Sequence, residues 1–220
     1  MTNQEGTGLM AFWARIEESY LDRFRQWHNS EHMPERVSIP GFLAGQRYLG
    51  HGTSNFFLMM YETRDPGVLG GPDYLARLNA PTAWTRESLP HFREPARNIY
   101  RHLAAQGRID LFSAPCMVSV RFNADATDAS LVERVAPQAG VARTRLFEID
   151  PEISGIQTSE RKIYGGGPGE QRWLLLVECA IGAGEEGAPL RTLLATASKG
   201  WRDVFLDLFT VDYVLEKRGG

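Results

Sequence analysis

The sequence predicts an α+β protein built from two ferredoxin-like halves. Each half reads as strand, helix, strand, strand and helix, and the second half adds a final strand. A faint internal repeat supports duplication, because Glu35-Arg36-Val37 followed by Arg47 matches Glu133-Arg134-Val135 followed by Arg145 at the same spacing. Antiparallel sheets with helices on one face leave the other face bare. Two such sheets that cover one another would form a pseudo-dimeric α/β barrel.

The first half, residues 9–107, follows a short lead at 1–8 that we expect to be disordered. We expect Pro34 to end or kink the first helix near His32, because the residue before a proline is pushed out of the helical region. The expected elements of this half are strands at 9–16, 42–49 and 56–62, helices at 17–32 and 73–79, and a mixed stretch at 81–102 with a helix near its end.

The second half, residues 108–220, reads as a diverged copy of the first. The glycine-rich stretch 165–169 has no following Lys-Ser/Thr and no helix start, so we interpret it as a flexible hairpin loop. The expected elements are strands at 117–122, 141–149, 172–181 and 209–216, a short helix at 129–135, and a helix at 189–208 interrupted near Gly200.

The composition is that of an ordinary soluble globular protein, with 43% hydrophobic and 23% charged residues. The net charge of −3 gives no reason to expect nucleic acid or a membrane surface as a partner. No apolar run is long enough to span a bilayer and the first residues lack signal-peptide features, so we expect a cytoplasmic protein. Cys116 and Cys179 lie in apolar runs, which predicts reduced, buried thiols.

One helical stripe concentrates the titratable residues. Leu21, Phe24, His28, Glu31 and His32 recur at three- and four-residue spacing, so they share a face that begins apolar and turns polar. Inward-facing imidazoles and carboxylates need partners, which predicts a cavity, a ligand or a hydrogen-bond network. The helix end and nearby carboxylates would favour the cationic form of His32 and make it an acid–base group near neutral pH. The alternative is a solvated, salt-bridged helix end.

From this stripe we expect His28 or His32 to transfer a proton, with Glu31 or Glu35 orienting the imidazole. The sequence leaves open which histidine does so. The residues expected to contact a substrate are Arg36, which would hold a carboxylate or enolate, and Arg47, Tyr48, Trp84 and Arg93. Trp84 and Arg93 belong to a stretch that could form an anion-binding wall, together with Arg86, His91 and Arg97, or could equally cap a surface helix.

The same residues raise the question of a metal. His28-x-x-Glu31-His32 matches the H-x-x-E-H zinc pattern, in which two histidines bind the metal and the glutamate acts as base. Because Pro34 is expected to break the helix at once, we do not expect a metal or other cofactor. A haem would need an axial histidine that faces a large cavity, which His28, His32 or His91 could supply.

The stretch Trp27-His28-Asn29-x-Glu31-His32-x-Pro34-Glu35-Arg36, followed by Ile39-Pro40-Gly41-Phe42 and Arg47-Tyr48, resembles the dimeric α/β-barrel superfamily and, within it, EthD-like proteins. The resemblance is clearest over residues 9–62. That superfamily includes cofactor-free monooxygenases, polyketide cyclases, decarboxylases, dehydratases, lactone isomerases and haem enzymes. The resemblance implies a pocket between sheet and helices, with the matching His28, Glu31, His32, Glu35 and Arg36 at or near it. Since the second half lacks the histidines, it implies one working site per chain.

We therefore expect a cofactor-independent enzyme that acts on a small hydrophobic, aromatic or polyketide-like substrate by His/Glu acid–base chemistry. A lyase (decarboxylation or dehydration), an isomerase and a cofactor-free monooxygenase all match this expectation, in a single-chain barrel or a homodimer. The alternatives are a non-catalytic small-molecule-binding or stress-response protein, and a haem or zinc enzyme.

Overall fold

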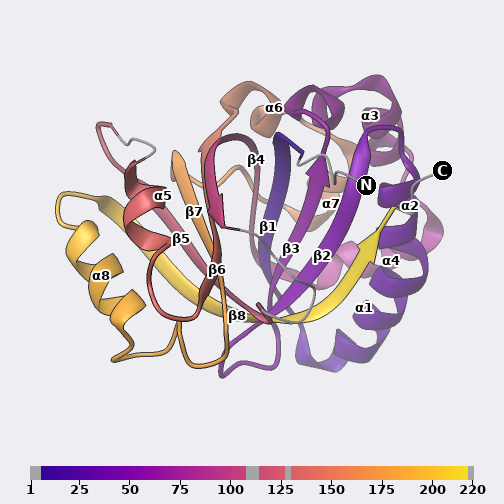
Figure 1. Ribbon diagram of the computed structural model, residues 1–220. Helices are drawn as coiled ribbons and strands as arrows, with labels where there is room; N and C mark the ends of the chain where they lie inside the picture. Colours follow the sequence, from indigo (N-terminus) through magenta and orange to yellow (C-terminus); the bar gives the residue numbers. More distant parts are fainter. Residues whose placement is uncertain (1–5, 108–113, 127–129, 218–220) are drawn as a thin grey trace. The chain divides into compact units, whose positions relative to one another are not determined.

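A computed structural model describes residues 6–107, 114–126 and 130–217, which form two compact units (Figure 1). The first unit comprises Met1–Arg101, Asp150–Gly169 and Asp212–Gly220, and the second comprises His102–Ile149 and Glu170–Val211. These units differ from the predicted halves, 9–107 and 108–220, because the segment Asp150–Gly169 packs with the first unit. Of the predicted lead at 1–8, residues 1–5 lie outside the described residues, and the first strand already begins at Gly8.

The sheet of the first unit has the strand order β4-β1-β3-β2, and every neighbouring pair is antiparallel. Its strands are β1 (Gly8–Ile16), β2 (Phe42–Gly50), β3 (Phe56–Thr63) and β4 (Phe92–Gly107). Alternate residues of a strand point to one face, so Met10 and Phe12 of β1 join Met59 of β3 in one apolar core. Phe24 and Trp27 of the first long helix bury their rings in the same core.

That helical segment runs from Leu21 to Ser38 as α1 (Leu21–Trp27), the π-helical turn η2 (His28–His32) and α2 (Met33–Ser38). Of the two outcomes expected at Pro34, an end of the helix near His32 is therefore wrong, because the helical segment continues to Ser38. Pro34 lies in the first turn of α2, where the wide π turn has just interrupted the α-helical ladder, and the missing proline N–H is tolerated there.

The remaining short helices of the first unit lie in the connections between its strands and in the inserted segment. They are η1 (Glu18–Tyr20), η3 (Pro66–Gly70), α3 (Pro72–Asn79), α4 (Ala83–Ser88), η4 (Leu89–His91), α6 (Pro151–Gly155) and α7 (Ser159–Tyr164). The helix expected near the end of 81–102 is wrong. There the chain forms β4, whose backbone pairs with β1 from Gly8↔Arg101 to Ile16↔Phe92.

The second unit has the strand order β8-β5-β7-β6. Its elements are β5 (Cys116–Asn123), α5 (Ser130–Val135), β6 (Val141–Ile149), β7 (Trp173–Cys179), α8 (Pro189–Ala197) and β8 (Arg202–Glu216). The helix expected over 189–208 ends at Ala197, because Gly200 adopts a φ of 93° and Arg202 then pairs with β5. Cys116 and Cys179 face each other across β5 and β7 as buried free thiols, as expected.

The eight strands follow the order β1-β3-β2-β8-β5-β7-β6-β4 of a closed barrel. The predicted fold class, duplicated ferredoxin-like units forming an α+β barrel, is confirmed. No helix among the described residues is long and apolar enough to cross a membrane.

One buried serine fastens the inserted segment to the first unit. The Ser154 hydroxyl of α6 accepts a hydrogen bond from the Ile99 N–H at 2.8 Å and donates one to the Ile99 carbonyl at 3.2 Å. The Asp150 N–H donates to the same carbonyl at 2.8 Å. Because Ser154 is fully buried, water cannot replace these bonds.

We predict that Ser154→Ala lowers the free energy of unfolding by about 1–3 kcal/mol, since it leaves the Ile99 N–H unpaired in the interior. Urea denaturation measures the change, and limited proteolysis should cut more rapidly within 150–169. The matched control is Ser54→Ala, because Ser54 is exposed and makes one long hydrogen bond, at 3.5 Å, to Glu18. Equal stability of the two variants would contradict the proposed anchoring role of Ser154.

Candidate functional site

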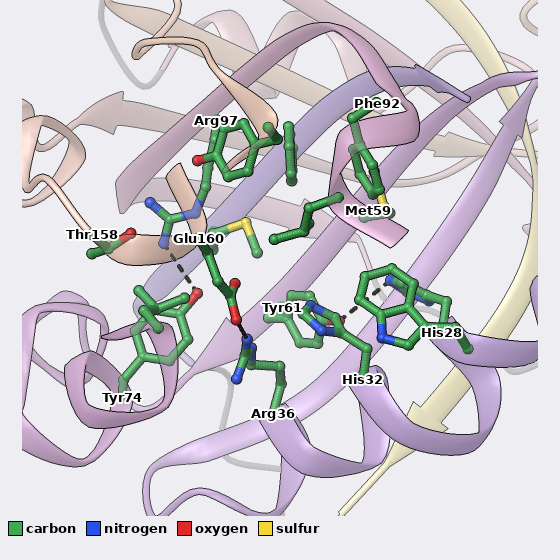
Figure 2. A pocket seen from close by; sticks show the side chains of 16 residues that line it. His28, His32, Arg36, Met59, Tyr61, Tyr74, Phe92, Arg97, Thr158 and Glu160 are labelled. Carbon is green, nitrogen blue, oxygen red and sulfur yellow. Dashed lines mark hydrogen bonds and ion pairs between the residues drawn. The ribbon is translucent and has the colours of Figure 1, made fainter. Parts of the chain in front are cut away.

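A cavity of about 30 Å³ lies in the first unit, between the sheet, the Leu21–Ser38 helical segment and α7 (Figure 2). Strands β1 and β3 supply an apolar floor, and the helical segment supplies polar side chains along one edge. The lining residues are Met10, Phe12, Trp27, His28, His32, Arg36, Met59, Tyr61, Tyr74, Leu78, Leu89, Phe92, Arg97, Thr158, Glu160 and Tyr164. Apolar walls with a few convergent polar groups are typical of small-molecule sites.

The helical segment places His28, His32 and Arg36 at this pocket, one every fourth residue. The two histidines form the ends of the π turn, and Arg36 follows one turn later in α2. Single π turns inside α-helices are frequent at functional sites. The predicted stripe therefore does face a cavity, although it continues past Pro34.

His28 is neutral and fully engaged. The Arg47 Nη1 donates to His28 Nδ1 at 3.1 Å, and a guanidinium can only donate, so Nδ1 carries no proton. Arg47 is itself held by Asp212, with 2.6 Å between Nε and Oδ2. Burial, together with the nearby Arg47 and Arg36 cations, lowers the pKa of His28 well below its usual value of 6.5. The ring proton must then lie on Nε2.

This tautomer determines the direction of the next hydrogen bond. His28 Nε2 lies 3.4 Å from the Tyr61 hydroxyl, so Nε2–H donates and the Tyr61 oxygen accepts. The Tyr61 proton remains available to another acceptor in the pocket. Burial raises the pKa of Tyr61 far above 10, so the hydroxyl stays protonated and acts as a donor.

The surroundings of His32 differ from those of His28. Nothing in the described chain hydrogen-bonds either of its ring nitrogens, and Nδ1 is buried. The ring rests against Trp27, with centroids 4.3 Å apart. Burial, then Arg36 and His28, lower the pKa of His32 well below 6.5. The predicted preference for the cationic form is thus wrong, because the helix continues beyond His32 and the facing charge is a cation.

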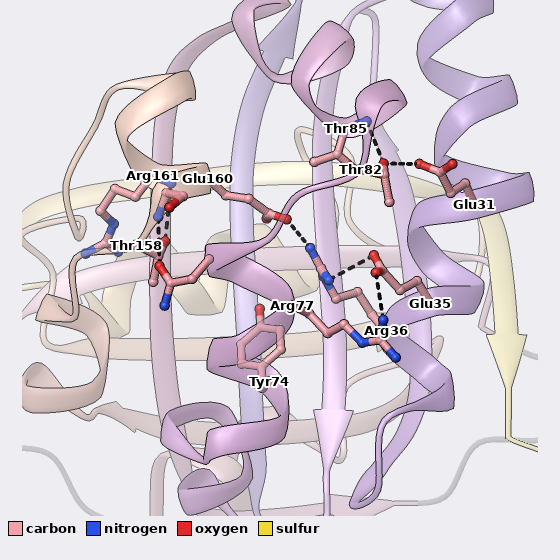
Figure 3. A network of polar contacts seen from close by, with 12 residues as sticks. Glu31, Glu35, Arg36, Tyr74, Arg77, Thr82, Thr85, Thr158, Glu160 and Arg161 are labelled. Carbon is pink, nitrogen blue, oxygen red and sulfur yellow. Dashed lines mark hydrogen bonds and ion pairs between the residues drawn. The ribbon is translucent and has the colours of Figure 1, made fainter.

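Arg36 is the buried cation beside His32, with 1% of its surface exposed. Its Nη2 forms a short ion pair with Glu160 of α7, and its Nη1 donates to Glu35 at 3.0 Å (Figure 3). Burial lowers the pKa of Arg36, but Glu160, Tyr74, Glu35 and Tyr61 together outweigh it, so the pKa of the guanidinium is raised. Burial also raises the pKa of Glu160, against the opposing effect of Arg36.

The other predicted site residues lie off the pocket lining. Glu31 accepts a hydrogen bond of 2.6 Å from Thr82, the N-cap of α4, and Glu35 lies between Arg36 and Arg77 (Figure 3). A role for either carboxylate in orienting an imidazole stays a prediction. Arg47 is also off the lining and is linked to the pocket through its hydrogen bond to His28.

The remaining predicted substrate contacts are engaged elsewhere. Tyr48 donates to Gln46 at 3.3 Å. Trp84 packs under the guanidinium of Arg23, 4.3 Å from the ring centroid. Arg93 donates to the Pro90 carbonyl at 2.7 Å and pairs with Glu17. The structure therefore brings together His28, His32 and Arg36 of the predicted set.

Sequence reasoning missed Tyr61, Tyr74, Thr158 and Glu160, all of which line the pocket. Thr158 is the N-cap of α7 and Glu160 lies in its first turn, in a part of the second half that was given no helix. Thr158-Ser159-Glu160 was the available signal, because an N-cap threonine followed by a glutamate in the first turn marks a helix start. No local pattern distinguishes the inward side chains of Arg97 and Tyr74.

The zinc pattern at His28, Glu31 and His32 does not form a metal site. Both His28 nitrogens are engaged, and Glu31 turns toward Thr82. Within the described ranges no three His, Cys, Asp or Glu side chains are grouped to hold a metal ion. These residues do not fit zinc.

With its side chains in their present positions, the site does not accommodate haem either. A cavity of about 30 Å³ is far smaller than a porphyrin. His91, the third candidate axial ligand, stacks on Tyr20 with centroids 3.8 Å apart and bonds to Glu17, outside the pocket lining.

No family model and no curated protein matches the sequence. Solved structures do match. An anthrone oxidase-like protein has a TM-score of 0.63 at 8% identity, with 98% of this chain and 94% of that one covered. A proposed monooxygenase from Fusobacterium nucleatum subsp. nucleatum has a TM-score of 0.59 at 9% identity, covering 97% and 96%.

The chlorite dismutase of Candidatus Nitrospira defluvii, solved with imidazole, has a TM-score of 0.52 at 11% identity, covering 96% and 93%. At such identities the similarity is one of fold. The narrower likeness to EthD-like proteins stays a prediction. The fold of this chain is that of the dimeric α/β-barrel proteins, as its sequence resemblance implied.

Proposed function

We propose that the chain is an enzyme in which His32 removes a proton from a small, largely apolar substrate bound in the pocket of the first unit. The observation that carries this proposal is the contrast between the two histidines. His28 has both ring nitrogens engaged, whereas His32 has neither hydrogen-bonded by a described residue. An unengaged, neutral imidazole in a polar-edged cavity is suited to accept a proton.

The neighbouring groups are suited to the charge that such a step creates. Removal of a proton from a phenol or an acidic C–H leaves a phenolate or enolate. Because His28 donates to the Tyr61 oxygen, the hydroxyl hydrogen of Tyr61 is not used in that bond and could be donated to the oxyanion. Arg36 adds a fixed positive charge beside His32. In this account His28 positions Tyr61 and does not move a proton itself.

Proton removal is the step shared by cofactor-free oxygenation, decarboxylation, dehydration and isomerisation. Two proteins of similar fold are described as a proposed monooxygenase and as anthrone oxidase-like, which favours oxygenation of an activated phenol or ketone. For anthrone the overall reaction with O₂ gives anthraquinone and water, and it begins with loss of a proton. We propose this reaction class without a bound cofactor.

The cavity must widen for a substrate of more than a few atoms. Met10, Met59 and Leu78 line it, and methionine has three rotatable bonds that adapt to the shape of a neighbour. We propose that these side chains move aside when the substrate enters.

We predict that His32→Gln lowers kcat by about 10²–10⁴-fold, the usual contribution of a general base, with little change in melting temperature. The assay uses a size-graded panel of enolisable ketones and activated phenols, from cyclohexane-1,3-dione to anthrone. Oxygen uptake and mass spectrometry follow the products, and heat-denatured protein gives the background. The matched control is His91→Gln, because His91 lies outside the pocket lining. Full turnover by His32→Gln would contradict the proposal.

We also predict an acid limb in kcat/KM that lies well below pH 6.5. A base must be unprotonated to act, and the pKa of His32 is lowered, so activity is retained above its folded-state pKa and lost as the pH falls through it. The free energy of unfolding should decline below pH 6.5. In that range the histidines of the unfolded chain become protonated, whereas His28 and His32 of the folded protein, with their lowered pKa values, stay neutral. An acid limb centred at or above pH 6.5 would be inconsistent with His32 as the base.

A further inference from the structure

We propose that the pocket takes an anionic ligand, and that Arg97 with Tyr74 binds its carboxylate. Calling that ligand the substrate rests on the proposed function, but anion binding is testable without turnover. Arg97, at 7% exposure, is buried in the pocket wall. Its hydrogen-bond partner is the Tyr74 hydroxyl, at 3.0 Å from Nη2, and no described carboxylate forms an ion pair with it.

Two other buried arginines of the first unit carry a charge pair, whereas Arg161, which has no ion pair among the described residues either, lies outside the pocket lining. Arg36 pairs with Glu160 and Glu35, and Arg47 pairs with Asp212. Burial lowers the pKa of Arg97, but Tyr74, Tyr164 and Glu160 together raise it, so the guanidinium stays charged. Because Glu160 bonds directly to Arg36, a ligand carboxylate could form the direct ion pair that Arg97 lacks among the described residues.

The carboxylates near the pocket bond directly to Arg36. Arg36 and Arg97 are the cations of the lining and Glu160 is its one carboxylate, whereas burial keeps His28 and His32 neutral. Glu160 bonds to one nitrogen of Arg36, and Glu35, which lies off the lining, bonds to another. Arg97 is therefore the lining cation whose direct ion pair a ligand carboxylate could form.

Tyr74 completes the anion site. Its oxygen accepts from Arg97, so its own proton can point to another acceptor next to the guanidinium. Arg97 and Arg36 both approach the Tyr74 ring, at 5.8 and 5.7 Å from its centroid. A planar guanidinium beside a hydroxyl donor suits the two oxygens of a carboxylate.

The position of this site specifies the class of ligand. In Figure 2, Arg97 and Tyr74 lie to one side of Glu160, and His28 and His32 lie to the other. A ligand held at Arg97 would place its apolar body along the floor of the pocket, with its reacting group toward His32. The substrate class is thus an apolar, aromatic or alicyclic, carboxylic acid with an acidic C–H or hydroxyl remote from the carboxylate. We assign the carboxylate to Arg97 and not, as the sequence predicted, to Arg36, because Nη1 and Nη2 of Arg36 already bond to Glu35 and Glu160.

The test compares benzoate with benzamide, its neutral counterpart of similar shape, by isothermal titration calorimetry on the full chain. Wild-type protein should bind benzoate about tenfold or more tightly than benzamide. Arg97→Gln should remove that preference and leave benzamide binding unchanged, which also shows that the variant pocket is intact. Arg93→Gln is the matched control, because Arg93 is exposed and outside the lining, and it should behave as wild type.

A thermal measurement gives a second readout. Benzoate should raise the melting temperature of the wild type but not of the variant. Equal benzoate affinity in wild type and Arg97→Gln, or no preference for benzoate in the wild type, would overturn the inference. His32→Gln should keep the benzoate preference, so failure of the anion site and failure of the proposed base are distinguishable.

Discussion

The buried ion pair between Arg36 and Glu160 is the interaction on which the candidate site depends. It joins α2 to α7, a helix from a segment more than a hundred residues later in the chain. Removing one partner of a buried pair leaves an uncompensated charge and costs about 3–5 kcal/mol. The pair therefore holds α7 against α2. This places Tyr164 of α7 and its N-cap, Thr158, at the pocket wall.

The same cation sets the electrostatics of the histidines. Arg36 and Arg47 lie close enough to His28 to oppose its protonation, and Arg36 does the same for His32. Arg47 further selects the tautomer of His28, which in turn aims the Tyr61 hydroxyl. One group of buried arginines thus accounts for a neutral base and an oriented proton donor. A third arginine, Arg97, lines the pocket with the Tyr74 hydroxyl as its hydrogen-bond partner.

The sequence predicted the fold class and one edge of the site for a physical reason. Strand alternation and the stripe at Phe24, His28 and His32 are local patterns with a fixed period, and burial follows from the period. The helix past Pro34 was missed, because a π turn is a departure from that period. The pairing of Arg36 with Glu160 was missed as well, because contacts between distant segments leave no local periodicity. The pKa direction predicted for His32 was wrong because burial, and then the Arg36 cation, lower that pKa, and neither could be read from the local pattern.

The most direct test of this account is an NMR titration of the imidazole nitrogens of His28 and His32, assigned with His28→Gln and His32→Gln variants. The account predicts that both rings are neutral at neutral pH and titrate well below 6.5, with His28 held in the Nε2–H form. A His32 that titrates at or above 6.5 would contradict it, because such a ring would be a cation at the pH where it is proposed to act as a base.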